Sequence, residues 1–219
     1  NPKPPTFENT IVAFDMAGQL LGEVGAVFYS LLSAATSQPM QDLANELAPL
    51  LSTHNDNIAL NDKLFARVKA VYDRRAKLKL DEVQRYLLEN TYRGFVRSGA
   101  LLDEKQKARM REINKEHSLL ALKFDDNVLA ETNSSFIVID SKEDLAGLPD
   151  GVIAEAAATA KAMAMEGKWV FTAQKTSWIP FLQYSPKRSL REALYTRWFM
   201  RGDRDNDKDN KAVLQKLLV

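Results

Sequence analysis

The composition of this chain predicts a soluble globular protein with a sizeable core, since 45% of its 219 residues are hydrophobic and 27% are charged. Lys and Arg number 30 against 29 Asp and Glu, so the charge balance gives no indication of a nucleic acid or acidic membrane partner. The chain has no cysteine, which excludes disulfides, thiolate zinc sites and cysteine nucleophiles.

The ends and the hydropathy of the chain give expectations about its location. No uninterrupted apolar run approaches the ~20 residues that span a bilayer, and no signal-peptide pattern opens the sequence. We therefore expect no membrane partner and a cytoplasmic protein, with the periplasm as the alternative. The first residue is Asn1 rather than Met, so we expect the chain to begin inside a longer gene product or after processing.

Residues 6–36 predict one long amphipathic helix capped by Thr6. Two of its glycines, Gly18 and Gly25, fall on the apolar stripe, and each would cost about 1 kcal/mol relative to alanine. We therefore expect the stripe to be buried against a closely approaching helix. The stripe comprises Phe7, Ile11, Phe14, Gly18, Leu21, Gly25, Phe28, Leu32 and Ala35. Further apolar residues widen this face, namely Leu20, Val24, Val27 and Leu31.

Four more helices are predicted in the next hundred residues. Pro39 is suited to opening the first of them, and Pro49 is expected to kink or end it. Its predicted buried side consists of Leu43, Leu47, Leu50 and Leu51. The caps predicted for the other three are Asn61 or Asp62, then Asp81, then Asp103 with Gln106 in a capping box. Inward-facing residues predicted on these helices include Phe65, Val68, Val71, Val83, Leu87, Leu88, Phe95, Val96, Ile113, His117, Leu120, Phe124 and Val128.

The pattern changes after residue 134. Residues 135–139 (SFIVI) and 169–173 (WVFTA) predict two short strands that can pair. An alanine-rich helix over 149–166, ended by Gly167, separates them. We expect an irregular segment through Trp178 and Pro180, then helices over 186–199 and 206–219. The predicted fold class is mainly α, one multi-helix unit over 1–219 with a small two-stranded β element.

The sequence offers few residues for chemistry. The two histidines, His54 and His117, lack the i, i+4 histidine partner and intervening glutamate of a zincin. We interpret His117 as a partly buried structural residue and His54 as a solvated one. Asp203, Asp205 and Asp207 alternate as in a calcium loop, but its sixth and twelfth positions would be lysine and leucine, so no EF-hand is expected.

A dense arginine series near the C-terminus is interpreted as ion-paired rather than as an anion site, with Glu192 and the following aspartates as partners. It consists of Arg188, Arg191, Arg197, Arg201 and Arg204. From these residues we predict no catalytic, cofactor-binding or metal-binding residue.

Two stretches resemble the thimet oligopeptidase family of zinc peptidases, with its bacterial peptidyl-dipeptidase (dipeptidyl carboxypeptidase) branch the nearest. The first comprises residues 5–14 (PTFENTIVAF) and 17–21 (AGQLL). The second comprises 169–172 (WVFT), 179–182 (IPFL), Arg188, 190–192 (LRE), Tyr195, Trp198, 201–202 (RG), 205–206 (DN), Asn210, 213–214 (VL) and 217–218 (LL). A weaker match covers residues 60–68 (LNDKLFARV).

The resemblance implies that residues 1–219 are the N-terminal helical region of a larger peptidase, with the catalytic HExxH domain absent from this chain. In that family, zinc polarises the scissile carbonyl while the glutamate of HExxH activates water. The N-terminal helices form one wall of a channel that admits short peptides. The implied partners are short peptides and the protein's own C-terminal catalytic half, and the implied cofactor is zinc, bound by the parent enzyme and not by this fragment.

The alternative is a non-catalytic helical interaction module. An HExxH motif encoded downstream would favour the peptidase, whereas a stop codon soon after residue 219 would favour the module. If the chain is a fragment, we also expect an exposed apolar patch near the C-terminal helices.

Overall fold

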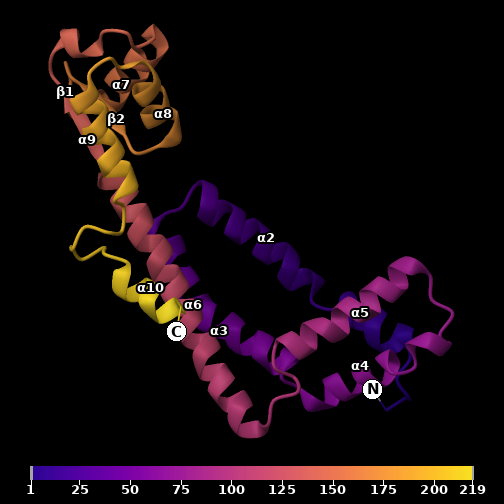
Figure 1. The fold of residues 1–219 in the computed structure, drawn as a ribbon. Helices are drawn as coiled ribbons and strands as arrows, with labels where there is room; N and C mark the ends of the chain where they lie inside the picture. The colour runs from indigo at the N-terminus through magenta and orange to yellow at the C-terminus, as the bar shows by residue number, and fades with distance from the viewer. Residues whose placement is uncertain (1, 219) are drawn as a thin grey trace. The chain divides into compact units, whose positions relative to one another are not determined.

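The computed structural model describes residues 2–218 and confirms the mainly α fold class with one small sheet (Figure 1). The chain divides into two compact units, the first ending at Leu119 and the second beginning at Leu120. The boundary falls within a helix of 31 residues, α6 (Glu104–Ser134). Each unit is described by itself.

The first unit is all helical. Its elements are η1 (Phe7–Val12), α1 (Ala13–Asp15), α2 (Gln19–Ala34), α3 (Gln38–Ala59), α4 (Asp62–Tyr72), η2 (Arg75–Lys77), α5 (Glu82–Arg97) and the first half of α6. The second unit combines the second half of α6 with β1 (Phe136–Ile139), η3 (Lys142–Leu145), α7 (Asp150–Ala162), β2 (Trp169–Thr172), α8 (Lys175–Tyr184), α9 (Arg188–Phe199) and α10 (Lys211–Leu218).

The single helix predicted over residues 6–36 is wrong, because the chain turns at Gly18. Its φ of 79° lies in the left-handed region, which favours glycine and ends a helix. The helix start is confirmed: the Thr6 hydroxyl accepts a hydrogen bond from the backbone N–H of Asn9, and the Asn9 side-chain oxygen accepts one from the backbone N–H of Thr6. The segment therefore consists of π-helical η1 and short α1, a turn, and then α2.

Burial of the predicted stripe also stops at this turn. Phe7 and Ile11 lie in the core, whereas α2 contains no buried residue. A Cβ placed on Gly18 or Gly25 would meet no atom within 4 Å, so the expectation of a closely packed helix at these glycines is wrong for the described chain. By length and composition alone, Phe7–Ala34 is apolar enough to cross a membrane.

The core of the first unit lies between η1, α4 and α5. It consists of Phe7, Ile11, Phe65, Val68, Val71, Leu88, Phe95 and Ala100. Tyr92 joins it through stacked rings, with centroids 3.8 Å from Tyr72 and 5.8 Å from Phe65. The predicted caps Asn61, Asp81 and Asp103 are confirmed by hydrogen bonds to backbone three residues ahead.

Several inward positions predicted for this unit are wrong. Val83 is 77% exposed on α5, and Ile113 and His117 are exposed on α6. On α3, Leu43 and Leu50 are exposed and Leu47 and Leu51 are half-buried, while Ala44 and Asp56 are the buried residues. Helix α3 begins as predicted, with proline in its first turn, but it continues through Pro49 to Ala59.

The second unit packs three helices around the small sheet. Strands β1 and β2 pair antiparallel, with Phe136 opposite Thr172 and Ile139 opposite Trp169, which confirms the predicted strands. Helices α7 and α8 pack on β2, and α9 packs on β1. Phe171 and Phe181 are fully buried at the centre, with ring centroids 4.5 Å apart.

Three boundaries in this unit differ from the predictions. Helix α7 ends at Ala162, before Gly167, because Met163 and Ala164 already close it, the latter with φ of 58°. The segment expected to be irregular is α8, which contains Pro180 and buries Phe181. Helix α10 begins at Lys211 rather than near residue 206, because hydrogen-bonded turns occupy residues 200–210.

Candidate functional site

The two histidines lie on different helices of the described chain. His54 is exposed on α3, as interpreted, and His117 is exposed on α6 rather than partly buried. Within residues 2–218, no group of three or more His, Asp or Glu side chains could hold a metal ion. The described residues therefore form no zincin-type site.

A lysine occupies the centre of the acidic loop. The Nζ atom of Lys211 lies 2.7 Å from Asp203 Oδ1, 2.9 Å from Asp205 Oδ1 and 2.7 Å from Asp209 Oδ2. Asp207 pairs instead with Lys208. One ammonium group thus pairs with three carboxylates and offsets part of their negative charge. These ion pairs link the loop between α9 and α10 to the first residue of α10.

This cluster predicts a pH dependence. The pKa of Asp209 is lowered from 3.8 to about 2, first by the Lys211 side chain and then by the backbone N–H groups of Lys211 and Asp205. Since the folded pKa lies below the unfolded one, Asp209 stabilises the fold above about pH 4, and this contribution is lost as the pH falls through about 2. We expect Asp209→Asn to lower the Tm at pH 7, and we expect this Tm difference from the parent chain to shrink as the pH falls from about 4 to about 2, measured by circular dichroism. A Tm difference as large at pH 2 as at pH 7 would contradict this.

The arginine series is divided among different partners. The predicted aspartate partners are wrong, because Asp203 and Asp205 bind Lys211 and the described ion pair of the series joins Arg204 to Glu131 of α6. Arg191 donates to the Ser185 carbonyl at 2.6 Å. Arg201 donates to the Trp198 carbonyl and to the Thr132 hydroxyl, both at 2.7 Å.

An open hollow of about 420 Å³ lies between α8 and α9 in the second unit. Its lining consists of Leu182, Arg188, Arg191, Glu192 and Tyr195. The two guanidinium groups can contact carboxylates, and the Tyr195 ring offers an apolar wall. The hollow brings together two of the predicted basic residues, but it holds no nucleophile and base pair that could do chemistry.

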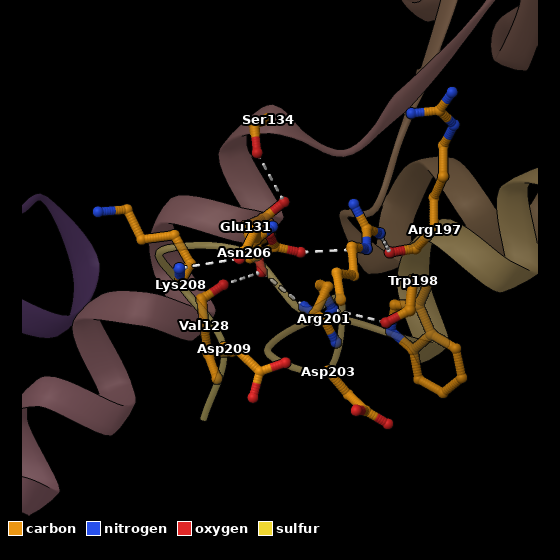
Figure 2. A network of polar contacts seen from close by, with 12 residues as sticks. Val128, Glu131, Ser134, Arg197, Trp198, Arg201, Asp203, Asn206, Lys208 and Asp209 are labelled. Carbon is orange, nitrogen blue, oxygen red and sulfur yellow. Dashed lines mark hydrogen bonds and ion pairs between the residues drawn. The ribbon is translucent and has the colours of Figure 1, made fainter. Parts of the chain in front are cut away.

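A buried polar network joins α6 to the loop between α9 and α10, and Figure 2 shows it around Glu131 and Asn206. Glu131 is 3% exposed. Its Oε1 atom accepts from Asn206 Nδ2 at 2.6 Å, and its Oε2 atom lies 3.1 Å from Arg204 Nε. The second contact has the distance of an ion pair without the alignment of a hydrogen bond. The arginine thus neutralises a carboxylate that the fold has removed from water.

Two asparagines extend this network one turn down α6. Asn127 donates to Asn210 Oδ1 at 2.8 Å, and Asn210 donates to the Phe124 carbonyl at 3.0 Å and, through its backbone, to the Gly202 carbonyl at 2.7 Å. Gly202 has φ of 74°, and a Cβ there would lie 3.1 Å from Asn210 Nδ2. Glycine is therefore required by both the backbone conformation and the close contact.

Sequence reasoning missed Glu131, Asn127 and Asn206 as a unit. The available signal was the i, i+4 spacing of Asn127 and Glu131 on the helix face that also carries Val128 and Phe124. Polar residues in that position need partners when buried. Their partners lie in the loop after α9, which no local pattern identifies.

No family model matches the chain. It is 34% identical over 218 residues to a dipeptidyl carboxypeptidase of Escherichia coli, with 100% of this chain and 32% of that protein covered. It is 26% identical over 220 residues to oligopeptidase A of Escherichia coli, covering 99% of this chain and 32% of that protein. It is 29% identical over 161 residues to an organellar oligopeptidase A of Arabidopsis thaliana, covering 71% and 20%.

These similarities confirm the predicted resemblance. They extend over essentially the whole chain for the two bacterial proteins, and the chain spans about a third of the length of each.

Proposed function

We propose that this chain, a homologue of dipeptidyl carboxypeptidases and oligopeptidase A along its whole length, is the N-terminal helical part of a longer peptidase. The similarity of 34% over 218 residues carries the proposal. The described residues form two compact units, each with its own hydrophobic core. A part of that kind can serve a peptidase by shaping access to a site located elsewhere.

The specific role that we propose is a wall of the substrate channel. Access restricted to short, unfolded peptides gives specificity without any reacting group on the wall itself. The proposed substrates are short peptides, and the proposed partner of these helices is the protein's own catalytic half. A cytoplasmic location remains part of the proposal, with the periplasm as the alternative.

We propose zinc dependence as well, with the zinc site outside this chain. Within residues 2–218 the side chains do not group into a metal-binding set, and both histidines are exposed on separate helices. We infer that the ligands and the general base lie in polypeptide outside residues 1–219.

The test uses the longer protein encoded by the parent gene beside the 219-residue chain. A short peptide with a free C-terminal carboxylate is offered to both, and products are identified by mass spectrometry. We expect the longer protein to cleave it, 1,10-phenanthroline to abolish the cleavage and added Zn²⁺ to restore it, while the 219-residue chain releases nothing. Cleavage by the chain alone, or cleavage insensitive to the chelator, would contradict the proposal.

Two matched substrates sharpen the result. The same peptide with an amidated C-terminus separates release of C-terminal dipeptides, which needs the carboxylate, from internal cleavage, which does not. A folded protein that contains the same cleavable segment tests the channel, and we expect it to resist cleavage until it is unfolded.

The second candidate function is the non-catalytic interaction module. The apolar surface of α2, which contains no buried residue, favours it as a specific observation. A gene that encodes no HExxH motif after residue 219 would support the module and reject the peptidase.

A further inference from the structure

Helix α2 carries an apolar stripe that no part of the first unit covers. Leu20, Val24, Val27 and Leu31 follow one another at helical spacings, and Val24 and Val27 are 59% and 62% exposed. The only charged residue of the helix is Glu23. We call these four side chains the α2 stripe. A monomeric soluble protein rarely exposes contiguous apolar residues of this kind unless they bind something.

The helix is apolar on more than one side. Phe28 and Leu32, on the neighbouring face, are half-buried. The helix therefore has one apolar face that is partly buried and a second, the α2 stripe, that is exposed. A helix at the surface of a globular protein normally turns charged residues to solvent there. Gly22 and Gly25 leave space as well, since a Cβ on either would meet no atom within 4 Å. This composition is typical of a helix that packs against other protein on two of its faces.

Helix α2 by itself is too short to cross a lipid bilayer. The turn at Gly18 limits α2 to 16 residues. At 1.5 Å per residue the helix is about 24 Å long, whereas the hydrocarbon core of a bilayer is about 30 Å thick. The apolar stretch Phe7–Ala34 reaches spanning length only by including residues on the far side of the turn.

We propose that the α2 stripe packs against an apolar surface of the remaining polypeptide of the longer protein. This inference rests on the proposed function. The length of the relatives supports the occupant, because the 218 matched residues are 32% of the dipeptidyl carboxypeptidase, so a homologous protein has about twice as much chain again outside these units. A covalently connected partner is present at high effective concentration, which keeps the stripe covered in the intact protein.

The test replaces two valines of the stripe in the longer protein and in the 219-residue chain. Val24→Gln with Val27→Gln removes apolar surface while improving helix propensity, so any loss of stability reports lost packing and not a weaker helix. We expect the Tm of the longer protein to fall by roughly 5 °C or more. The Tm of the 219-residue chain is expected to stay unchanged, and its self-association at high concentration, measured by light scattering, to decrease.

The control pair is Val83→Gln with Leu101→Gln. Both are exposed apolar residues of the first unit, at 77% and 62%, and neither belongs to α2. We expect this pair to leave the Tm of both proteins unchanged. The peptidase assay is run in parallel. A longer protein without activity would reject the proposed function. An active longer protein whose Tm is unchanged by the two α2 substitutions would reject this inference alone.

Other outcomes would overturn the inference by identifying a different occupant. An equal loss of Tm in the 219-residue chain would show that residues of this chain cover the stripe. Dissociation of a dimer of the longer protein in the α2 pair, with the Tm of the separated protein unchanged, would assign the stripe to a second copy. Loss of co-flotation with anionic vesicles in the α2 pair would assign it to a lipid surface.

Discussion

Replacing Arg204 with methionine is expected to destabilise the second unit by about 3 kcal/mol. The side chain of Glu131 is nearly buried, and Arg204, itself 25% exposed, provides its ion pair. Removal of the arginine leaves the carboxylate with Asn206 as its described donor. Urea unfolding followed by tryptophan fluorescence measures the effect on this unit alone, because all three tryptophans, Trp169, Trp178 and Trp198, lie in it.

A second substitution distinguishes the effect of leaving a buried carboxylate unpaired from the effect of lost packing. Adding Glu131→Gln to Arg204→Met removes the charge and keeps the side-chain shape, so we expect the double variant to recover about 1 to 2 kcal/mol. Arg188→Met makes the same replacement at an exposed position of α9 and is expected to change little. If the double variant is less stable than Arg204→Met alone, the ion pair does not explain the loss.

Truncating Phe181 to alanine is expected to cost about 3 to 5 kcal/mol of unfolding free energy in the same unit. Phe181 is fully buried on α8, with its ring against Phe171 of β2. The substitution removes apolar contacts and leaves a cavity between the sheet and the helix. Because Trp178 lies on the same helix, its fluorescence follows the loss of this packing directly.

The matched control for this truncation is Phe199→Ala. Phe199 is 63% exposed at the end of α9, and its ring lies 5.5 Å from that of Tyr195 and 6.4 Å from that of Trp198, measured between centroids. We expect its truncation to cost less than about 1 kcal/mol. Equal losses for the two phenylalanines would mean that the core of the second unit is not centred where the structure places it.

The exposed aromatic residues of α9 also bear on the patch expected near the C-terminal helices. Tyr195 and Phe199 are exposed there, as are Leu214 and Leu218 on α10. These side chains are candidates for contact with further polypeptide. The α2 stripe, at the other end of the sequence, is the surface that the sequence did not predict to be exposed.

The sequence predicted helix starts better than helix burial. Thr6, Asp81 and Asp103 form their capping hydrogen bonds with residues three positions ahead, so a short window contains the whole interaction. The inward positions of Val83 and His117 were wrong because periodicity identifies an apolar face without identifying what covers it. The two strands were predicted correctly because β-branched runs bounded by polar residues are also contained in a short window of sequence.

Sequence alone therefore determined the mainly α class, the caps, the two strands and, through its resemblance, the peptidase homology. Tertiary structure decided where the chain turns at Gly18, that α2 carries an uncovered stripe, and that Glu131 is neutralised by Arg204 and bonded to Asn206, 75 residues away. The physical reason is the sequence separation over which each interaction acts. Caps and periodicity act within one or two helical turns, whereas burial and the pairing of buried charges depend on residues that only the folded chain brings together.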